Sequence, residues 1–230
     1  DEAFKAMVST ATWTRFPGLK EYMTLGYAPY DRDATAASNT LEYSFDDFTI
    51  YAAALKEGRT DIAEPFARRA LYYRNTFDKT LGFASPRYAD GRFKADLDPY
   101  QTYNEGFIEG NSWNFSFHAP QDVYGLMGIM GGEEAFLQKL NRLFEMNLPP
   151  KYYKDNEDIT ADCLVGGYVH GNEPSHHIPY LYAWTSTPWL TQQRLRTIMN
   201  KMYRNHILGG VVGVREVGVL AGLLVDVAGQ

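Results

Sequence analysis

Hydrophobic residues along much of the chain recur every three to four positions, which is the spacing of one face of an α-helix. The clearest run is 39–56, where Leu41, Phe45 and Phe48 share a face and Gly58 follows as a stop signal. The same spacing predicts further helices over residues 61–77, 120–130, 133–146, 173–183 and 191–203. The chain is therefore predicted to fold from helices rather than strands.

Two long polar segments separate these helices. Residues 81–106 are rich in glycine, proline and aspartate, and residues 151–167 are polar and acidic. Paired helices with long loops between alternate pairs are typical of an α/α toroid, in which the long loops build a pocket at one end. Because no internal repeat or low-complexity linker divides the chain, we expect one all-α unit over residues 1–230, with an atypical Val/Gly/Leu-rich tail from about residue 210.

The composition of the chain limits the classes of function that are open to it. Of the 230 residues 45% are hydrophobic and 15% are aromatic, a proportion that suits core packing and the lining of a polar-ligand cleft equally well. The net charge of −6 and the lack of a long basic run argue against nucleic-acid binding. The one cysteine, Cys163, excludes an intrachain disulfide.

Targeting signals are not evident in the sequence. No apolar run approaches the roughly 18 residues of a membrane span. No signal peptide is present and the chain begins at Asp1 within a pattern, so we expect a processed or truncated piece of a longer protein.

The most informative segment is EGNSWNFSFHAPQDVYGLMGIMGG, residues 109–132. A carboxylate, an amide and a tryptophan this close together suggest a sugar site, where rings stack on the indole and polar groups bind hydroxyls. Glu109 follows apolar Phe107 and Ile108, as suits a carboxylic acid of raised pKa in glycoside hydrolysis. The alternative is that Glu109 only caps a helix.

A second segment, GYVHGNEPSHHIPYLYAW, gathers three histidines around Asn172 and Glu173. Adjacent His176 and His177 would point about 100° apart on a helix, which disfavours a shared zinc ion. Asn172 would serve equally well as a helix N-cap.

Asp46 and Asp47 lie inside an apolar helix, so one of them must point inward and needs a partner there. A carboxylate that ties helices together explains this pair as well as a catalytic role does.

Together these segments resemble the catalytic domain of glycoside hydrolase family 92, the calcium-dependent exo-α-mannosidases. The matching stretches cover most of residues 19–205 in the family's order: LGYAPYDRDATAASNTLEYSFDDF, EGNSWNF with DVYGLMGIMGG, LPPKYY, HGNEPSHHIPYLY and PWLTQQRLRTIM. The resemblance implies an (α/α)6 toroid, incomplete here and without the family's N-terminal β-sandwich domain.

The resemblance also implies a function. Members would hydrolyse terminal α-linked mannose from glycans, in the periplasm or after secretion, with inversion at the anomeric carbon. In an inverting mechanism an acid protonates the leaving oxygen while a base activates water on the opposite face of the sugar. A Ca²⁺ ion would help to distort the ring, and Ca²⁺ prefers carbonyl and carboxylate oxygens.

Site residues follow from the family motifs by position. Glu109 corresponds to the general acid, and Asn172 and Glu173 to the calcium ligands. The substrate-binding residues would be Asn111, Trp113, Asp122, His170 and Glu173, although a structural role for Asp122 is equally open.

The sequence departs from the family in two places. Gln121 stands where the family usually has a histidine. The acidic cluster that would supply the general base is mostly replaced in Gly213–Gly218, where Glu216 is the one carboxylate.

Three explanations of the second departure are open. The tail is a reading-frame or assembly error, which we favour, or the chain is a degenerate member, or Glu216 acts as the base from a shifted position. A chain without a base would bind mannosides without hydrolysing them. A different (α/α)6 enzyme, such as a polysaccharide lyase, is a further alternative.

Overall fold

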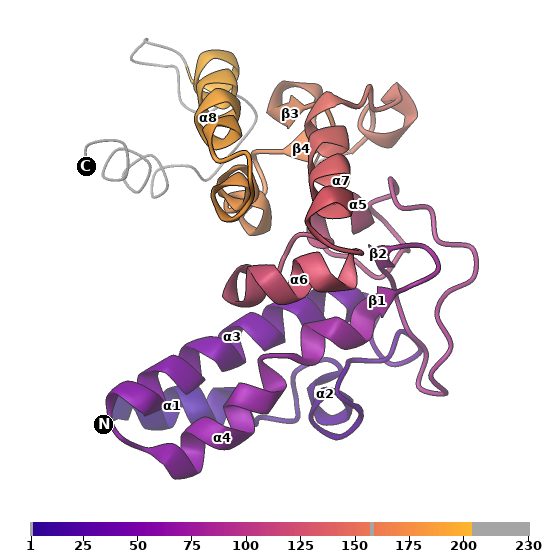
Figure 1. The fold of residues 1–230 in the computed structure, drawn as a ribbon. Coiled ribbons are helices and arrows are strands. Elements are labelled where there is room, and N and C mark those ends of the chain that lie inside the picture. Colours follow the sequence, from indigo (N-terminus) through magenta and orange to yellow (C-terminus); the bar gives the residue numbers. More distant parts are fainter. Residues whose placement is uncertain (1, 157–158, 204–230) are drawn as a thin grey trace. The chain divides into compact units, whose positions relative to one another are not determined.

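The computed structural model describes residues 2–156 and 159–203. The chain forms two compact units, residues 1–143 and residues 144–230. Figure 1 labels the elements of both. Each unit is described separately below.

The first part of unit 1 is built from four helices: α1 Glu2–Thr10, α2 Leu19–Leu25, α3 Ala36–Lys56 and α4 Thr60–Arg69. The long helix α3 packs along α4 and also contacts α1 (Figure 1). Phe4, Ala54 and Ala63, one from each of these three helices, form a small buried core. The helix predicted over 39–56 is confirmed, with three more residues at its start, and Gly58 follows it with a φ of +70° as a left-handed stop.

The second part of unit 1 contains shorter elements: the 3₁₀ turn Tyr72–Thr76, β1 Phe77–Asp78, β2 Phe83–Ala84, α5 Ser112–Phe115, the 3₁₀ turn Pro120–Asp122, α6 Val123–Ile129 and most of α7 Glu133–Glu145. Strands β1 and β2 pair antiparallel, with Phe77 opposite Ala84. The helices predicted over 120–130 and 133–146 are confirmed, although the first begins as a 3₁₀ turn.

The helix predicted over 61–77 is wrong beyond Arg69. The chain instead turns, because contacts with distant residues replace the helical ladder there. The side-chain amide of Asn75 donates to the Gly26 carbonyl at 2.8 Å, and the Tyr73 hydroxyl donates to Asp122 at 2.8 Å.

Unit 2 consists mainly of 3₁₀ turns and one helix: Pro150–Tyr152, Ala161–Cys163, β3 Leu164–Val165, β4 Tyr168–Val169, Glu173–Ser175, Ile178–Trp184 and α8 Trp189–Met202. The helix predicted over 173–183 is wrong in kind, since two 3₁₀ stretches occupy it. Pro174 and Pro179 each lie in the first turn of one stretch and provide no amide hydrogen for a continuous α-helix. Helix α8 confirms the last predicted helix.

Over the described residues the protein is mostly helical, and its named strands are two-residue antiparallel pairs. No helix in this part of the chain has both the length and the apolar character needed to cross a membrane.

Candidate functional site

A loop docked on the first turn of α3 leads into the EGNSW segment. The backbone amides of Ala37 and Ser38 donate to the Gly106 carbonyl at 2.9 and 3.2 Å, and the Ile108 amide donates to the Ser38 hydroxyl at 3.1 Å. Gly106 has a φ of +82°, and a β-carbon there would lie 2.5 Å from a side-chain carbon of Pro86. Only glycine fits this contact, so the loop packs closely against Pro86 while its backbone is hydrogen-bonded to α3.

Glu109 has a strained backbone at the end of this loop. Its φ is +56°, in the left-handed region that costs a non-glycine residue roughly 1 kcal/mol and that concentrates at functional sites. Phe107 is buried and stacks on Phe115 at 5.5 Å between ring centroids, whereas Ile108 and Glu109 are exposed. The carboxyl group of Glu109 is therefore accessible to a ligand.

Asn111 and Trp113, which follow Glu109 in the sequence, are both buried. The Asn111 side chain caps α5 by accepting from the Asn114 amide at 3.1 Å, and it donates to the Tyr100 carbonyl at 3.2 Å. Trp113 is 8% exposed and packs edge-on against Phe83 at 4.8 Å. In this arrangement both side chains fix the shape of the segment from within.

Lys139 of α7 completes this aromatic cluster. Its ammonium nitrogen lies 3.5 Å from the centroid of the Phe83 ring and 5.9 Å from that of Trp113, and it donates to the Gly82 carbonyl. Burial lowers the pKa of Lys139 to about 8.

Asp122 is held by three donors. It caps α6 by accepting from the Gly125 amide at 3.0 Å, and it accepts from the Tyr73 hydroxyl at 2.8 Å and the Arg74 guanidinium at 2.5 Å. Burial favours a higher pKa for Asp122, but the hydrogen bonds from Arg74, Tyr73 and Gly125 outweigh it and lower the pKa. These contacts stabilise the fold around Asp122, and substrate binding by Asp122 stays a prediction. Beside it, Gln121 donates to the Ala70 carbonyl at 3.2 Å.

Glu42 on α3 is a half-buried carboxyl that the sequence analysis missed. Burial, followed by the charges of Asp46 and Glu109, raises its pKa to about 7. The sequence holds one usable signal, since Glu42 lies four residues after Ser38 and four before Asp46 and thus shares a helix face with both.

Asp47 is the inward-pointing member of the Asp46–Asp47 pair, at 1% exposure. Its carboxylate accepts from the Tyr22 hydroxyl at 2.7 Å and from Nε of Arg69 at 2.8 Å. Burial raises the pKa of Asp47 to about 6, against the lowering effects of Arg69 and Tyr22. Asp47 thus ties α2, α3 and α4 together, as the structural reading expected.

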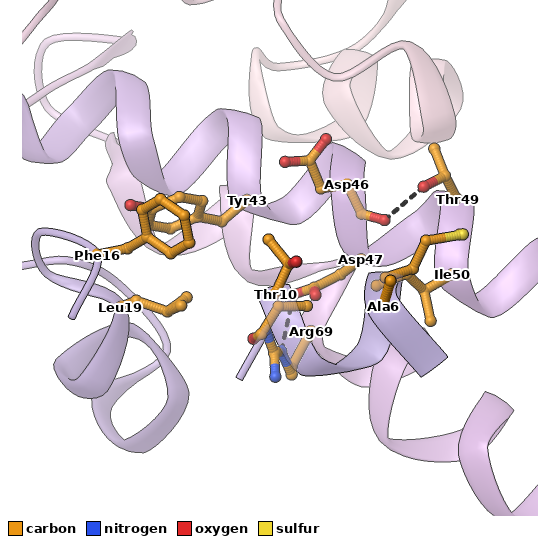
Figure 2. A pocket seen from close by; sticks show the side chains of 12 residues that line it. Ala6, Thr10, Phe16, Leu19, Tyr43, Asp46, Asp47, Thr49, Ile50 and Arg69 are labelled. Carbon is orange, nitrogen blue, oxygen red and sulfur yellow. Dashed lines mark hydrogen bonds and ion pairs between the residues drawn. The ribbon is translucent and has the colours of Figure 1, made fainter. Parts of the chain in front are cut away.

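A cavity of about 460 Å³ lies beside this ion pair (Figure 2). Its wall carries Phe16, Tyr43, Asp46, Asp47 and Arg69. Because Asp47 and Arg69 bind each other, Asp46 is the acidic group on this wall outside the ion pair. Among the described residues, none of those named as site residues from the family motifs lines this cavity.

In unit 2, His170 bridges two tyrosines. Its Nδ1 lies 2.8 Å from the Tyr168 hydroxyl and its Nε2 lies 2.9 Å from the Tyr203 hydroxyl, while Nε2 of His176 lies 2.7 Å from the His170 carbonyl. Burial, with a smaller effect of His176, lowers the pKa of His170 to about 4. His170 is therefore neutral at neutral pH, and both its ring nitrogens are engaged.

Asn172 and Glu173 lie at the turn after His170. Asn172 is buried and Glu173 is exposed. Their oxygen donors suit Ca²⁺, which takes six to eight oxygen ligands, so the two side chains would supply part of a shell. Over residues 2–156 and 159–203 no group of three or more His, Cys, Asp or Glu side chains gathers as a metal site. The candidate base Glu216 lies outside the described residues.

Sequence comparison matches the chain to one family model and to a curated relative. The model of the glycosyl hydrolase family 92 catalytic domain matches residues 1–225, a range that includes Glu216. An uncharacterized secreted glycosidase of Arthroderma benhamiae is 26% identical over 239 residues, which cover 90% of this chain and 28% of that protein.

Solved structures agree with the family match. The family GH92 α-mannosidase BT3965 of Bacteroides thetaiotaomicron is 33% identical, with a TM-score of 0.81 over 92% of this chain and 26% of that one. Its complex with mannoimidazole gives a TM-score of 0.82. The inverting GH92 mannosidase BT2199 of the same organism is 33% identical, with a TM-score of 0.70 over 81% of this chain and 26% of that one. The chain thus spans little more than a quarter of the length of these relatives.

Proposed function

The chain belongs to glycoside hydrolase family 92, and from this premise we propose that its protein hydrolyses terminal α-linked mannose from glycans. The observation that carries the proposal is the EGNSW segment, which holds an accessible carboxyl group on a strained backbone. The similar structures include an α-mannosidase in complex with mannoimidazole, which supports mannose as the sugar bound.

The proposed reaction proceeds with inversion, as the similarity to an inverting mannosidase supports. Glu109 donates its proton to the leaving glycosidic oxygen. A base on the other face of the sugar removes a proton from the attacking water, and such a pair of carboxyl groups stands roughly 6.5–9.5 Å apart. Glu216 is the candidate base. Asn111 and Trp113 hold the acid's segment in shape through the contacts described above.

A calcium ion is proposed to be bound through Asn172 and Glu173. When bound, it would supply positive charge for the sugar hydroxyls. Asn172 is buried and Glu173 is exposed, so Glu173 is the more accessible of the two side chains to a sugar hydroxyl.

We further infer a complete (α/α)6 toroid and a location outside the cytoplasm for the whole protein. The location rests on the relative from Arthroderma benhamiae, which is described as secreted. Cell fractionation of cells that express the protein from its own gene tests this location.

The function is tested by the release of mannose from an aryl α-mannoside, with and without a calcium chelator. We expect release that stops on chelation and returns with added Ca²⁺. A second candidate, mannoside binding without hydrolysis, is favoured by the single carboxylate of Gly213–Gly218. Binding of mannose with no release would support this second candidate. An unsaturated product that absorbs in the near ultraviolet would instead identify a lyase.

A further inference from the structure

The cavity beside the buried ion pair of unit 1 is lined by one face of α3 (Figure 2). Tyr43, Asp46 and Ile50 follow one another along this face at spacings of three and four residues, together with Asp47. The segment ahead of α2 adds Phe16 to the lining. The cavity volume of about 460 Å³ lies within the range of roughly 300–1,000 Å³ that is usual for small-molecule sites.

The charges that line this cavity are not balanced. Nε of Arg69 donates to Asp47 at 2.8 Å and its Nη2 donates to the Ala11 carbonyl at 2.7 Å, so this cation is compensated within the fold. Within residues 2–156 and 159–203 the Asp46 carboxylate accepts no hydrogen bond and joins no ion pair, and burial raises its pKa without an opposing effect from a cation. One negative charge of the lining is therefore left without a counter-charge in the described part of the chain.

The aromatic part of the lining also suits a cation. The Tyr43 hydroxyl donates to a backbone carbonyl at 3.0 Å, which leaves the ring of this side chain for a ligand. Burial, followed by the charges of three carboxylates, raises the pKa of Tyr43 to about 12. The three carboxylates are those of Asp33, Glu42 and Asp46. Cations bind the faces of aromatic rings, and Phe16, which is 37% exposed, offers a second ring.

We propose that this cavity is a binding site for a small organic ammonium ion that carries an apolar group. The ammonium group donates to the Asp46 carboxylate, and the apolar group packs against Phe16, Tyr43 and Ile50. A neutral sugar would leave the charge of Asp46 uncompensated. The site does not depend on the proposed function, because no described residue named for mannose hydrolysis lines the cavity.

The test measures the binding of phenethylammonium by ligand-observed saturation-transfer NMR at pH 7, in the protein expressed from its own gene. Phenethyl alcohol is the matched neutral probe, because it replaces only the ammonium group by a hydroxyl. Asp46→Asn removes the charge and keeps the size of the side chain. Ala6→Trp fills the cavity from an exposed position of α1. Glu57→Gln, which removes an exposed carboxylate directly after α3, is the control variant.

We expect wild type to bind phenethylammonium saturably at millimolar concentrations, and to bind phenethyl alcohol about fivefold more weakly. Asp46→Asn should weaken the binding of phenethylammonium by about fivefold and leave that of phenethyl alcohol unchanged. Ala6→Trp should weaken the binding of both probes, whereas Glu57→Gln should change neither. Methyl α-mannoside should not displace phenethylammonium.

Equal affinities of wild type for the two probes would overturn the proposal without any variant. A folded Asp46→Asn protein that binds phenethylammonium as tightly as wild type would also overturn it. If Asp46→Asn fails to fold in a thermal unfolding assay, Ala6→Trp and the comparison of the two probes decide the question. A lack of saturable binding to wild type, or displacement of phenethylammonium by methyl α-mannoside, would reject the site.

Discussion

Glu109 has both an exposed carboxyl group and a left-handed backbone, and the two properties can be separated by mutation. Glycine adopts positive φ without strain, whereas alanine keeps the cost of a β-carbon. We expect the free energy of unfolding of Glu109→Gly to exceed that of Glu109→Ala by about 1 kcal/mol. At most positions the glycine variant is the less stable of the two. Urea denaturation measures this difference.

Both variants should release mannose from a poorly activated substrate about 10²–10⁴-fold more slowly than wild type, since neither retains a proton donor at this position. A Glu109→Ala variant as stable as Glu109→Gly would show that the backbone at this position is not strained in solution.

Asp122 stabilises unit 1 through its cap and its ion pair. Asp122→Ala removes both and should lower the free energy of unfolding by about 1–2 kcal/mol, whereas Asp122→Asn keeps a capping oxygen and should lose less. The pKa of Asp122 is lower in the folded state, so its ionic contribution is complete above about pH 4 and is lost as pH falls through the folded-state pKa.

Urea denaturation of wild type and Asp122→Asn at pH 7 and pH 3 tests this sign. The difference in the free energy of unfolding between the two proteins should be smaller at pH 3 than at pH 7. A difference that grows with acidity would contradict the assigned role.

At the scale of elements, the docking of the 104–110 loop on α3 should control activity. Gly106→Ala would place a β-carbon 2.5 Å from a side-chain carbon of Pro86 and force the loop to shift, without removing any catalytic group. We expect a loss of kcat/KM of at least about tenfold, because small displacements of a catalytic group are costly.

Gly58→Ala is the matched control for this prediction. Gly58 also has positive φ, but a β-carbon there meets nothing within 4 Å. The variant Gly58→Ala should lower the free energy of unfolding by about 1 kcal/mol and leave kcat/KM unchanged. Equal kinetic effects of the two variants would argue against a positioning role for the loop.

Regular helices were predictable from the sequence because their apolar spacing continues over several turns, as in α3 and α7. The turn at 72–76 was not predictable, because Asn75 donates to a carbonyl far away in sequence. The 3₁₀ stretches within 173–184 were not predictable either, because Pro174 and Pro179 provide no amide hydrogen for an α-helix. Glu42 was missed for a related reason. The spacing from Ser38 to Asp46 shows only that Glu42 shares a helix face with them, whereas the contact of Ser38 with Ile108 lies far away in sequence and no local pattern reveals it.

For the whole molecule, family membership was predictable from a few specific segments, and the comparisons confirm it. The catalytic assignment rests on two segments in different units, around Glu109 and around Asn172, and on Glu216 outside the described residues. Calcium and the base therefore stay predictions, and they are best tested through the reaction itself.

The most direct measurement is proton NMR of the sugar released from a terminal α-mannoside by the protein expressed from its own gene, with Ca²⁺ present. The account predicts that β-mannose appears first and then equilibrates to the α-anomer. It also predicts that Glu109→Gln releases mannose about 10²–10⁴-fold more slowly from a poorly activated substrate. Initial release of α-mannose, or an unchanged rate in Glu109→Gln, would contradict it.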